Sequence, residues 1–389
     1  MSELINKTDS RATIRWKLLT GASAAALISS AYCANAADAD NPPLWASIGW
    51  QLEHVQDSSE VYNPVSILNQ LEGAGFSSPL SLERPAPYSS GAEASLTFQP
   101  EGTDWVFSAA VRYGRSHNGR SSSEKTTPTS VKAWSYYTSY VRRGVLHRNR
   151  FYRSYVALAH RYSDASAQNS ENHLIVDFQA GKDVGLGMFG DQGKSVLSAG
   201  VRFAHLRSSI TDTIKGDPDF TWVTLSGSPH PYYDQKWHDL AASAHGFREF
   251  RGLGPSISWN ASSPVAGNAQ NGEILLDWGV NAALLFGRQK TRIHRQSTST
   301  YHTCYNGIDC YNSSVYHYPA NPVNRIRNVV VPNLGGFAGL SYRFQDVKVS
   351  AGYRADFFFN AIDGGFDTRK SENSSFNGPF LNVSVGIGD

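Results

Sequence analysis

Hydrophobic and polar residues alternate with a period of two along much of the chain. In the first such segment, 44–54, an apolar set alternates with a polar one, namely Leu44, Ala46, Ile48, Trp50 and Leu52 against Ser47, Gly49, Gln51 and Glu53. Because successive side chains of a β-strand point to opposite faces, this spacing gives the segment one apolar and one polar face. The pattern therefore predicts a β-strand that separates an apolar environment from an aqueous one.

The same alternation recurs in a hairpin at 92–113, whose turn occupies 100–104. Phe98 and Trp105 flank this turn, at the position where membrane β-barrels carry interfacial aromatic residues. Further alternating segments occupy 174–181, 197–203, 253–259, 274–286, 334–344, 347–359 and 381–387. Their lengths of roughly 7 to 13 residues bracket the 9–11 residues of a tilted transmembrane strand.

The number and spacing of these segments predict the architecture. They give ten clear strands, and 134–141 with 151–162 supplies a further pair. Short or moderate connections at 100–104, 261–272 and 345–346 interleave with long polar ones at 56–91, 207–236 and 288–329, as periplasmic turns and extracellular loops do. We therefore expect an all-β fold, a transmembrane antiparallel up-and-down β-barrel of about 12 strands, and the weak signal of each strand leaves 10–14 strands open.

Composition favours a membrane barrel over a soluble β-sandwich. The chain has 34 Gly, 47 aromatic residues and two Met, an unusual set for a soluble core. In a barrel, aromatic residues line the two membrane interfaces while small and polar residues face the lumen. A soluble sandwich would also alternate, but its polar face should be rich in Lys and Glu, whereas the polar positions here are rich in Gly, Ser and Asn.

The first 36 residues have the organisation of a secretory signal peptide. Four basic residues precede the apolar stretch 18–28, and the small residues that follow suit cleavage between Ala36 and Ala37. The apolar stretch falls short of the about 20 residues of a transmembrane helix, which disfavours a retained anchor. We expect a cleaved signal peptide at 1–36 and an outer-membrane β-barrel with long extracellular loops at 37–389.

Charge and cysteine content narrow the classes of function. Cleavage removes four basic and two acidic residues and leaves 31 of each kind, so the mature chain offers no electrostatic support for nucleic-acid binding. Only Cys304 and Cys310 remain, in a segment rich in Tyr, Asn and Ser. Such a pair suits a disulfide in an oxidising compartment, with two free thiols as the alternative.

If the apolar positions face lipid, a set of charged and amide residues faces the lumen. These candidate lumen-lining residues are Glu93, Arg112, Asp177, Gln179, Arg202, Glu273, Asp277, Asn281, Lys348, Arg354 and Asp356. Two interpretations follow. The charges could line a wet channel and bias which solutes pass, or they could pair across a narrow lumen and plug it.

No motif predicts catalysis or a bound cofactor. None of the twelve histidines lies in a His-x-Ser pair, the spacing that would put a base and a nucleophile on one side of a strand. The cysteine and histidine spacing within 288–329 fits no zinc pattern, so an ordered surface loop is favoured there over a metal site. Asp363, Gly364, Gly365 and Asp367 are better explained by a tight turn than by a calcium loop.

Several runs of sequence resemble one known family. They read DFQAGKDVGLG at 177–187, LSAGVRF at 197–203, RGLGPSISW at 251–259, and YRADFFFNAIDGGFDTRKSE with GPFLNVSVGIG between 353 and 388. These runs resemble the Legionella-type major outer-membrane pore-forming protein family. The resemblance covers roughly 44–389, is strongest after Asp177, and implies a porin-like β-barrel of the outer membrane.

The leading hypothesis is therefore an outer-membrane pore for passive diffusion of ions and small hydrophilic solutes. The alternative is a surface-exposed adhesin or receptor that binds through its long Tyr-rich loops while the lumen stays blocked. Expected partners are outer-membrane lipid and lipopolysaccharide, the barrel-assembly machinery and small solutes, with homo-oligomers left open. We expect no enzymatic activity, no cofactor, no metal and no nucleic acid.

Overall fold

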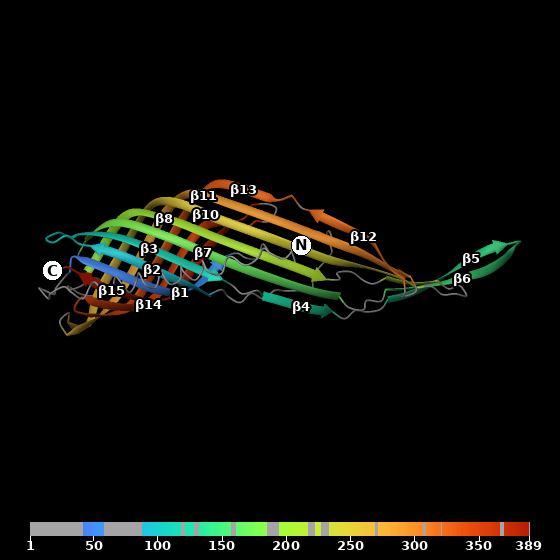
Figure 1. Cartoon of the computed structure of the whole chain (residues 1–389), viewed down its shortest axis with the longest axis horizontal. Helices are drawn as coiled ribbons and strands as arrows, with labels where there is room; N and C mark the ends of the chain where they lie inside the picture. Colours follow the sequence, from blue (N-terminus) through green and yellow to red (C-terminus); the bar gives the residue numbers. More distant parts are fainter. Residues whose placement is uncertain are drawn as a thin grey trace, which may run out of the picture.

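A computed structural model describes residues 42–57, 88–117, 121–127, 132–156, 161–184, 194–216, 222–226, 233–268, 271–305, 309–319, 321–365 and 369–388. All regular secondary structure in these ranges is β-strand (Figure 1). They contain no helix that is long and apolar enough to cross a membrane. The expected signal peptide and its cleavage site at Ala36 and Ala37 lie outside the described residues.

Fifteen strands belong to one antiparallel sheet. They are β1 (Leu44–Asp57), β2 (Tyr88–Phe98), β3 (Trp105–His117), β4 (Ser121–Thr127), β5 (Lys132–Arg142), β6 (Val145–Val156), β7 (Arg161–Asp183), β8 (Lys194–Gly216), β9 (Trp222–Ser226), β10 (Tyr233–Asn268), β11 (Gly272–Tyr305), β12 (Asp309–Pro319), β13 (Val323–Phe344), β14 (Val347–Asp363) and β15 (Ser371–Ile387).

Ten of these strands close into a barrel. Around the wall they run β1, β2, β3, β7, β8, β10, β11, β13, β14 and β15, and β15 pairs back with β1 from Leu44↔Ile387 to Asp57↔Ser374. Closure leaves this part of the sheet without an edge strand, as a bilayer requires of a spanning sheet. The structure thus confirms an all-β antiparallel barrel.

The wall has two strands fewer than the expected twelve, and ten is the lower end of the range of 10–14 that the sequence left open. The predicted extra pair corresponds to β5 and β6, which form a hairpin that continues through β9 to the far end of β10 (Figure 1). Within the wall, β3 pairs directly with β7 from Trp105↔Lys182 to His117↔Ser170, so no further pair fits between them. Alternation identified the two strands, but alternation does not reveal whether a hairpin lies in the wall or beyond it.

The wall also extends much further than the alternation predicts. The polar stretches 207–236 and 288–329, expected to be loops, largely continue as strands of β8, β10, β11 and β13. At 36 residues, β10 is about 120 Å long, several times the thickness of a bilayer. Beyond the membrane band the outward face of these strands contacts water while inward residues such as Ile210 and Ile293 stay buried, so the backbone ladder continues without an apolar outer face.

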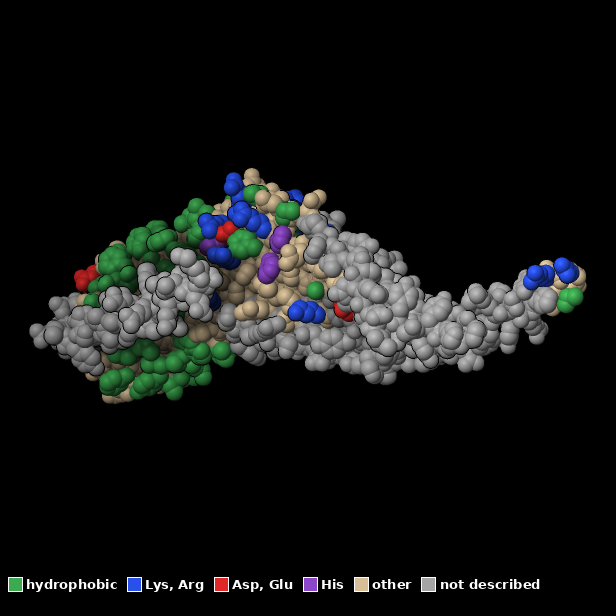
Figure 2. Space-filling model, turned by 45° about the vertical axis from the view of Figure 1, so that its right-hand side comes forward, with side chains coloured by type: hydrophobic (Ala, Val, Ile, Leu, Met, Phe, Trp, Pro, Cys, Tyr) green, Lys and Arg blue, Asp and Glu red, His purple; other side chains and the backbone are tan. Residues whose placement is uncertain are grey.

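The outer surface carries an apolar band near the short turns. On β11 the outward residues Ile274, Val280, Leu284 and Phe286 are all exposed, and corresponding residues follow on the neighbouring strands. Figure 2 shows hydrophobic side chains covering this end of the barrel and basic side chains gathered beyond them. Phe98, Trp105, Tyr342 and Phe344 lie at the short-turn end of the band, which matches an aromatic girdle of a transmembrane barrel.

A second apolar surface lies inside the barrel. Twelve buried residues pack together there: Val55, Ile175, Ala204, Leu206, Phe250, Ala283, Leu285, Val331, Phe358, Ala361, Ile362 and Phe376. They come from eight wall strands, so the cluster reaches across the lumen. The barrel core is therefore built by inward-facing side chains.

Candidate functional site

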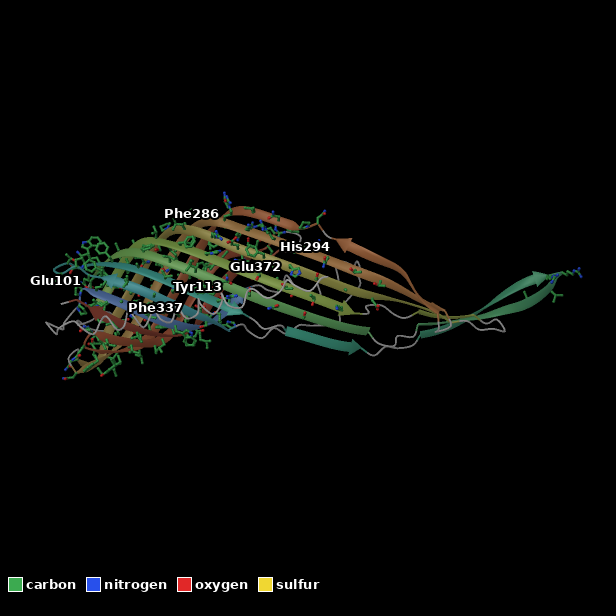
Figure 3. All side chains as sticks on the ribbon, in the orientation of Figure 1. Glu101, Tyr113, Phe286, His294, Phe337 and Glu372 are labelled. Carbon is green, nitrogen blue, oxygen red and sulfur yellow. The ribbon has the colours of Figure 1, made fainter. Side chains whose placement is uncertain are left out.

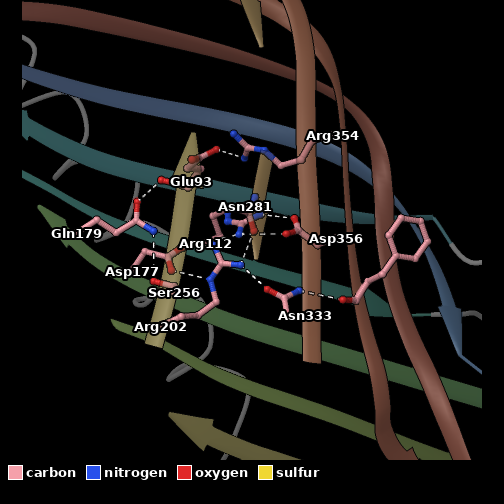
Figure 4. Close-up of polar contacts among 12 residues, drawn as sticks. Glu93, Arg112, Asp177, Gln179, Arg202, Ser256, Asn281, Asn333, Arg354 and Asp356 are labelled. Atoms are coloured by element: carbon pink, nitrogen blue, oxygen red, sulfur yellow. Dashed lines mark hydrogen bonds and ion pairs between the residues drawn. The ribbon is translucent and has the colours of Figure 1, made fainter. Parts of the chain in front are cut away.

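A polar network crosses the lumen beside this apolar cluster. Arg112 of β3 contacts Asp356 of β14, and the distance from Arg112 Nη1 to Asp356 Oδ2 is 2.5 Å (Figure 4). These two strands are four positions apart around the ten-stranded wall, so the contact spans the lumen. Arg112 Nη2 also lies 3.9 Å from Asp177 Oδ2 of β7. One guanidinium thus links two carboxylates on different sides of the barrel.

Arg202 of β8 joins the network from the opposite direction. It donates to both carboxylate oxygens of Asp177, over 2.6 Å from Nε and 3.0 Å from Nη2, the bidentate geometry that suits a guanidinium. Its Nη1 donates to Asn281 Oδ1 at 2.6 Å and also to Asn333 (Figure 4). Arg202 is 2% exposed and Asp177 9%, so these charges are taken almost completely out of water.

Two further groups extend the network. Arg354 donates to Glu93 of β2, and its guanidinium lies 5.1 Å from the ring centre of Phe380. Gln179 accepts a hydrogen bond from Ser258 at 2.7 Å and donates to Ser256 at 3.3 Å. All of these side chains point into the barrel. Side chains alternate between the two faces along each strand, so every second residue from an inward-facing one also faces inward.

Two ion pairs lie closer to the short turns. Arg343 Nη1 is 3.6 Å from Glu273 Oε1, and the two residues are direct cross-strand partners in β13 and β11. Lys348 Nζ lies 2.7 Å from Asp277 Oδ2, and Asp277 Oδ1 accepts a hydrogen bond from Ser262 at 2.6 Å. All eleven candidate residues thus have a hydrogen-bond or ion-pair partner inside the barrel.

Sequence reasoning missed five partners of these residues. Asn333 and Arg343 fall on the inward phase of β13, and Ser256, Ser258 and Ser262 fall on the inward phase of β10. The period-two rule could have found all five, because each lies an even number of residues from another inward position. Asn333 was missed because it stands one residue before the expected segment 334–344.

The apolar cluster lies directly over the network, on the side of the long strands. On five strands the next inward position after a network residue is apolar, with Ile175 beyond Asp177, Ala204 beyond Arg202, Ala283 beyond Asn281, Val331 beyond Asn333 and Phe358 beyond Asp356. Phe358 is 0% exposed, and its ring centre lies 6.1 Å from that of Phe376. Side chains therefore fill the lumen at this level: the charges pair across it, and an apolar layer covers the pairs.

The hairpin tip between β14 and β15 completes the apolar layer. Ala361 and Ile362 of the tip are buried in the cluster. Gln289 Nε2 donates to the carbonyl oxygen of Asn360 at 2.7 Å, and Arg325 Nε donates to Asp363 at 2.8 Å. Asp363 also accepts the backbone N–H of Gly365 at 3.0 Å. Asp363 therefore stabilises the turn and also binds Arg325, which holds the turn in place. Asp367 lies outside the described residues.

The expected cysteine pair lies beyond the membrane band. In the backbone register Cys304 of β11 stands directly opposite Cys310 of β12. Nothing is described of their side chains. Directly opposed antiparallel residues have Cα atoms about 4.5–5.5 Å apart, within the range of a disulfide. The described residues contain no group of three or more His, Cys, Asp and Glu side chains arranged to hold a metal ion.

We expect Cys304 and Cys310 to form a disulfide in protein isolated from the outer membrane. A thiol-alkylating reagent should then label neither cysteine under denaturing conditions until a reductant is added, as read by peptide mass. The bond closes a short loop and should change the thermal midpoint little. Full labelling of both thiols before reduction would contradict the prediction.

Comparison with known proteins gives one informative match. A family model described as the Legionella pneumophila major outer membrane protein precursor matches residues 125–387. No curated protein matches the chain.

Solved structures match only weakly. The transport unit of the autotransporter AIDA-I from Escherichia coli has 7% identity, 94% coverage of this chain and 98% of that chain, and a TM-score of 0.21. The toluene transporter TodX of P. putida has 9% identity, coverages of 90% and 93%, and a TM-score of 0.18. OmpT of Vibrio cholerae has 7% identity, coverages of 90% and 99%, and a TM-score of 0.14. TM-scores this low support no structural argument.

Proposed function

Because the chain belongs to the family of the Legionella pneumophila major outer membrane protein, we propose that it forms a pore for passive diffusion of ions and small hydrophilic solutes. The family match confirms the resemblance found in the sequence and places the protein in the outer membrane. The family is one of outer membrane proteins and not an enzyme class. What we propose beyond family and location is that the barrel forms a pore.

One observation carries the proposal, namely the charges that face the lumen at the depth of the apolar band. Five carboxylates, Glu93, Asp177, Glu273, Asp277 and Asp356, face five cations, Arg112, Arg202, Arg343, Lys348 and Arg354. Charged side chains at membrane depth are costly and characteristically mark pathways for ions. Equal numbers of each sign suit a pore with weak selectivity between anions and cations.

The same network restricts the proposed pore. A barrel of eight strands has an interior just wide enough for side chains to fill, and ten strands leave only slightly more room. Conduction therefore requires Arg112 and Asp356 to separate and the apolar layer around Phe358 to part. On this proposal the arrangement described above is a restricted state, and opening moves side chains while the wall stays closed.

Single-channel recording in a planar bilayer tests the proposal. We expect discrete conductance steps from the refolded protein, and greater cation selectivity in Arg112→Ala and in Arg354→Ala, because each leaves a carboxylate unpaired in the lumen. Reversal potentials in a salt gradient measure this shift. Lys182→Ala is the matched control, since Lys182 is 56% exposed at a short turn and should leave selectivity unchanged. A silent bilayer with a folded, heat-modifiable barrel would overturn the pore.

A specific observation favours a second candidate, a surface-binding barrel with a blocked lumen. The strands β7, β8, β10 and β11 project far beyond the apolar band and carry the β5–β6 hairpin at their end (Figure 1). Deletion of the hairpin at 132–156 separates the candidates. Loss of binding to host or bacterial surfaces with unchanged permeability supports a binding barrel, whereas unchanged binding with altered conductance supports the pore.

A further inference from the structure

The barrel wall opens into a notch where β13 and β14 part. The two strands pair from Asn333↔Phe358 to Phe344↔Val347, but β13 continues beyond Asn333 paired with β11 alone. On the other side, β14 bends at a register shift between Phe358 and Ile362 into the hairpin tip described above. A pocket of about 820 Å³ lies in this gap, lined by residues of β11, β13 and the β14–β15 tip.

The notch lies at the boundary of the apolar band. Along β11 the outward residues are apolar as far as Phe286, which lies on the upper side of the wall in the view of Figure 3, and the next outward residue is Arg288. Along β13, Val330 is the corresponding last apolar residue before Asn328. Long strands and loops mark the extracellular side of such barrels. The pocket therefore lies at the level of the outer leaflet headgroups.

The chemistry of the pocket is amphipathic and basic. Phe286 and Val330 give it an apolar wall, and Arg288, Arg327 and Arg369 give it three guanidinium groups. None of the lining residues is acidic. Arg369 donates to Ser371 Oγ at 2.7 Å, whereas Arg288 and Arg327 have no ion pair or hydrogen bond through their side chains in the described part of the chain.

A nearby arginine at the same level of the wall, unlike Arg288 and Arg327, has a carboxylate partner. Arg251 of β10 is the direct cross-strand partner of Arg288, and its Nη2 lies 2.6 Å from Glu249 Oε1. Burial alone would raise the pKa of Glu249, but hydrogen bonds from His205 and Arg251 and the charge of Arg251 lower it. Glu249 therefore stays ionised and neutralises Arg251. Among the described residues, Arg288 and Arg327 have no such carboxylate partner and lie beside an apolar wall, which points to an external anion.

We propose that the notch binds a phosphorylated lipid of the outer leaflet, of the lipopolysaccharide class. Guanidinium groups bind phosphate through paired charge-assisted hydrogen bonds, so Arg288 and Arg327 hold the phosphate and Arg369 closes the far side. The acyl chains of the lipid continue down the outside of the wall past Phe286 and Val330. This site lies outside the lumen, so its occupancy does not depend on the proposed pore.

Binding of purified lipopolysaccharide to the refolded full-length protein in detergent tests the site. We expect Arg288→Ala and Arg327→Ala each to weaken the affinity roughly ten-fold or more, as the loss of one charge-assisted hydrogen bond implies. Arg292→Ala is the matched control, because it removes an equal charge from the outward face of β11 outside the pocket lining and should leave the affinity unchanged. Heat-modifiable mobility confirms that each variant has folded.

Two further arms separate the sources of the phosphate. Dephosphorylated lipopolysaccharide should bind the wild-type protein as weakly as intact lipopolysaccharide binds the Arg288→Ala variant. Millimolar inorganic phosphate should not displace the lipid, because it lacks the apolar contact with Phe286 and Val330. Equal weakening by Arg292→Ala would show a general charge effect and overturn the site. Displacement of the lipid by inorganic phosphate would show that the notch is a simple anion site and would contradict the proposal that its ligand is a lipid.

Discussion

Arg202→Ala is expected to lower the free energy of unfolding of the barrel by about 3–5 kcal/mol, the usual cost of removing one partner from a buried ion pair. Arg202 donates two hydrogen bonds to Asp177 and others to Asn281 and Asn333. Without it, Asp177 keeps only the 3.9 Å contact with Arg112, and a carboxylate stays buried with too few donors. Urea unfolding of the protein in lipid vesicles, followed by tryptophan fluorescence, measures the change.

Two further variants serve as controls for Arg202→Ala. Lys182→Ala removes an exposed pair with Asp104, in which the two side chains are 56% and 67% exposed, and should change stability by less than about 0.5 kcal/mol. Asp177→Asn combined with Arg202→Ala should recover part of the loss, because the uncompensated charge is gone. If the double variant is as unstable as the sum of the two single variants, Arg202 and Asp177 do not act as a pair.

Phe358→Ala is expected to have an effect of similar size for a different reason. Phe358 is 0% exposed in the apolar layer, so its truncation should lower the free energy of unfolding by about 3–5 kcal/mol. It also removes the ring that covers the ion pairs. If the pore proposal holds, single-channel conductance should rise, because water gains a path from the long-strand side to Arg112 and Asp356.

The adjacent residue Phe359 offers a matched control. It points outward and is 37% exposed, so Phe359→Ala removes an equal ring from the opposite face of the same strand. This variant should destabilise the barrel less and leave conductance unchanged. Equal conductance changes in the two variants would show that the apolar layer does not restrict the lumen. Unchanged conductance in both, with stability lost only in Phe358→Ala, would limit the layer to a structural role.

The direction of the wall residues within the alternating segments was determined by the sequence itself. The period of two in 44–54, 92–113 and 347–359 fixes which side chains face lipid, because strand geometry alternates them with no help from the rest of the fold. That is why the eleven candidate residues could be selected from single segments. The short runs that resemble the outer-membrane protein family likewise indicated the location of the protein without any knowledge of its fold.

Which of these residues meet was decided only by the tertiary structure. Arg112 and Asp356 are 244 residues apart, and their contact depends on the number of strands and on closure of β15 onto β1. The apolar layer could not be predicted from single segments either. Ile175 and Phe358 are apolar residues at positions that are otherwise polar in their strands, so each appears as an isolated exception in the sequence. Such residues form a layer only when eight strands bring them together.

The extent of the strands and the notch also depended on the assembled fold. Polar segments within 207–236 and 288–329 lack an apolar outward face, because water replaces lipid there, yet the backbone ladder extends through much of them. The notch arises because β14 leaves β13 at Asn333, which is a property of two strands together. The sequence determined which way each strand faces, and pairing around the closed wall decided what those faces contact.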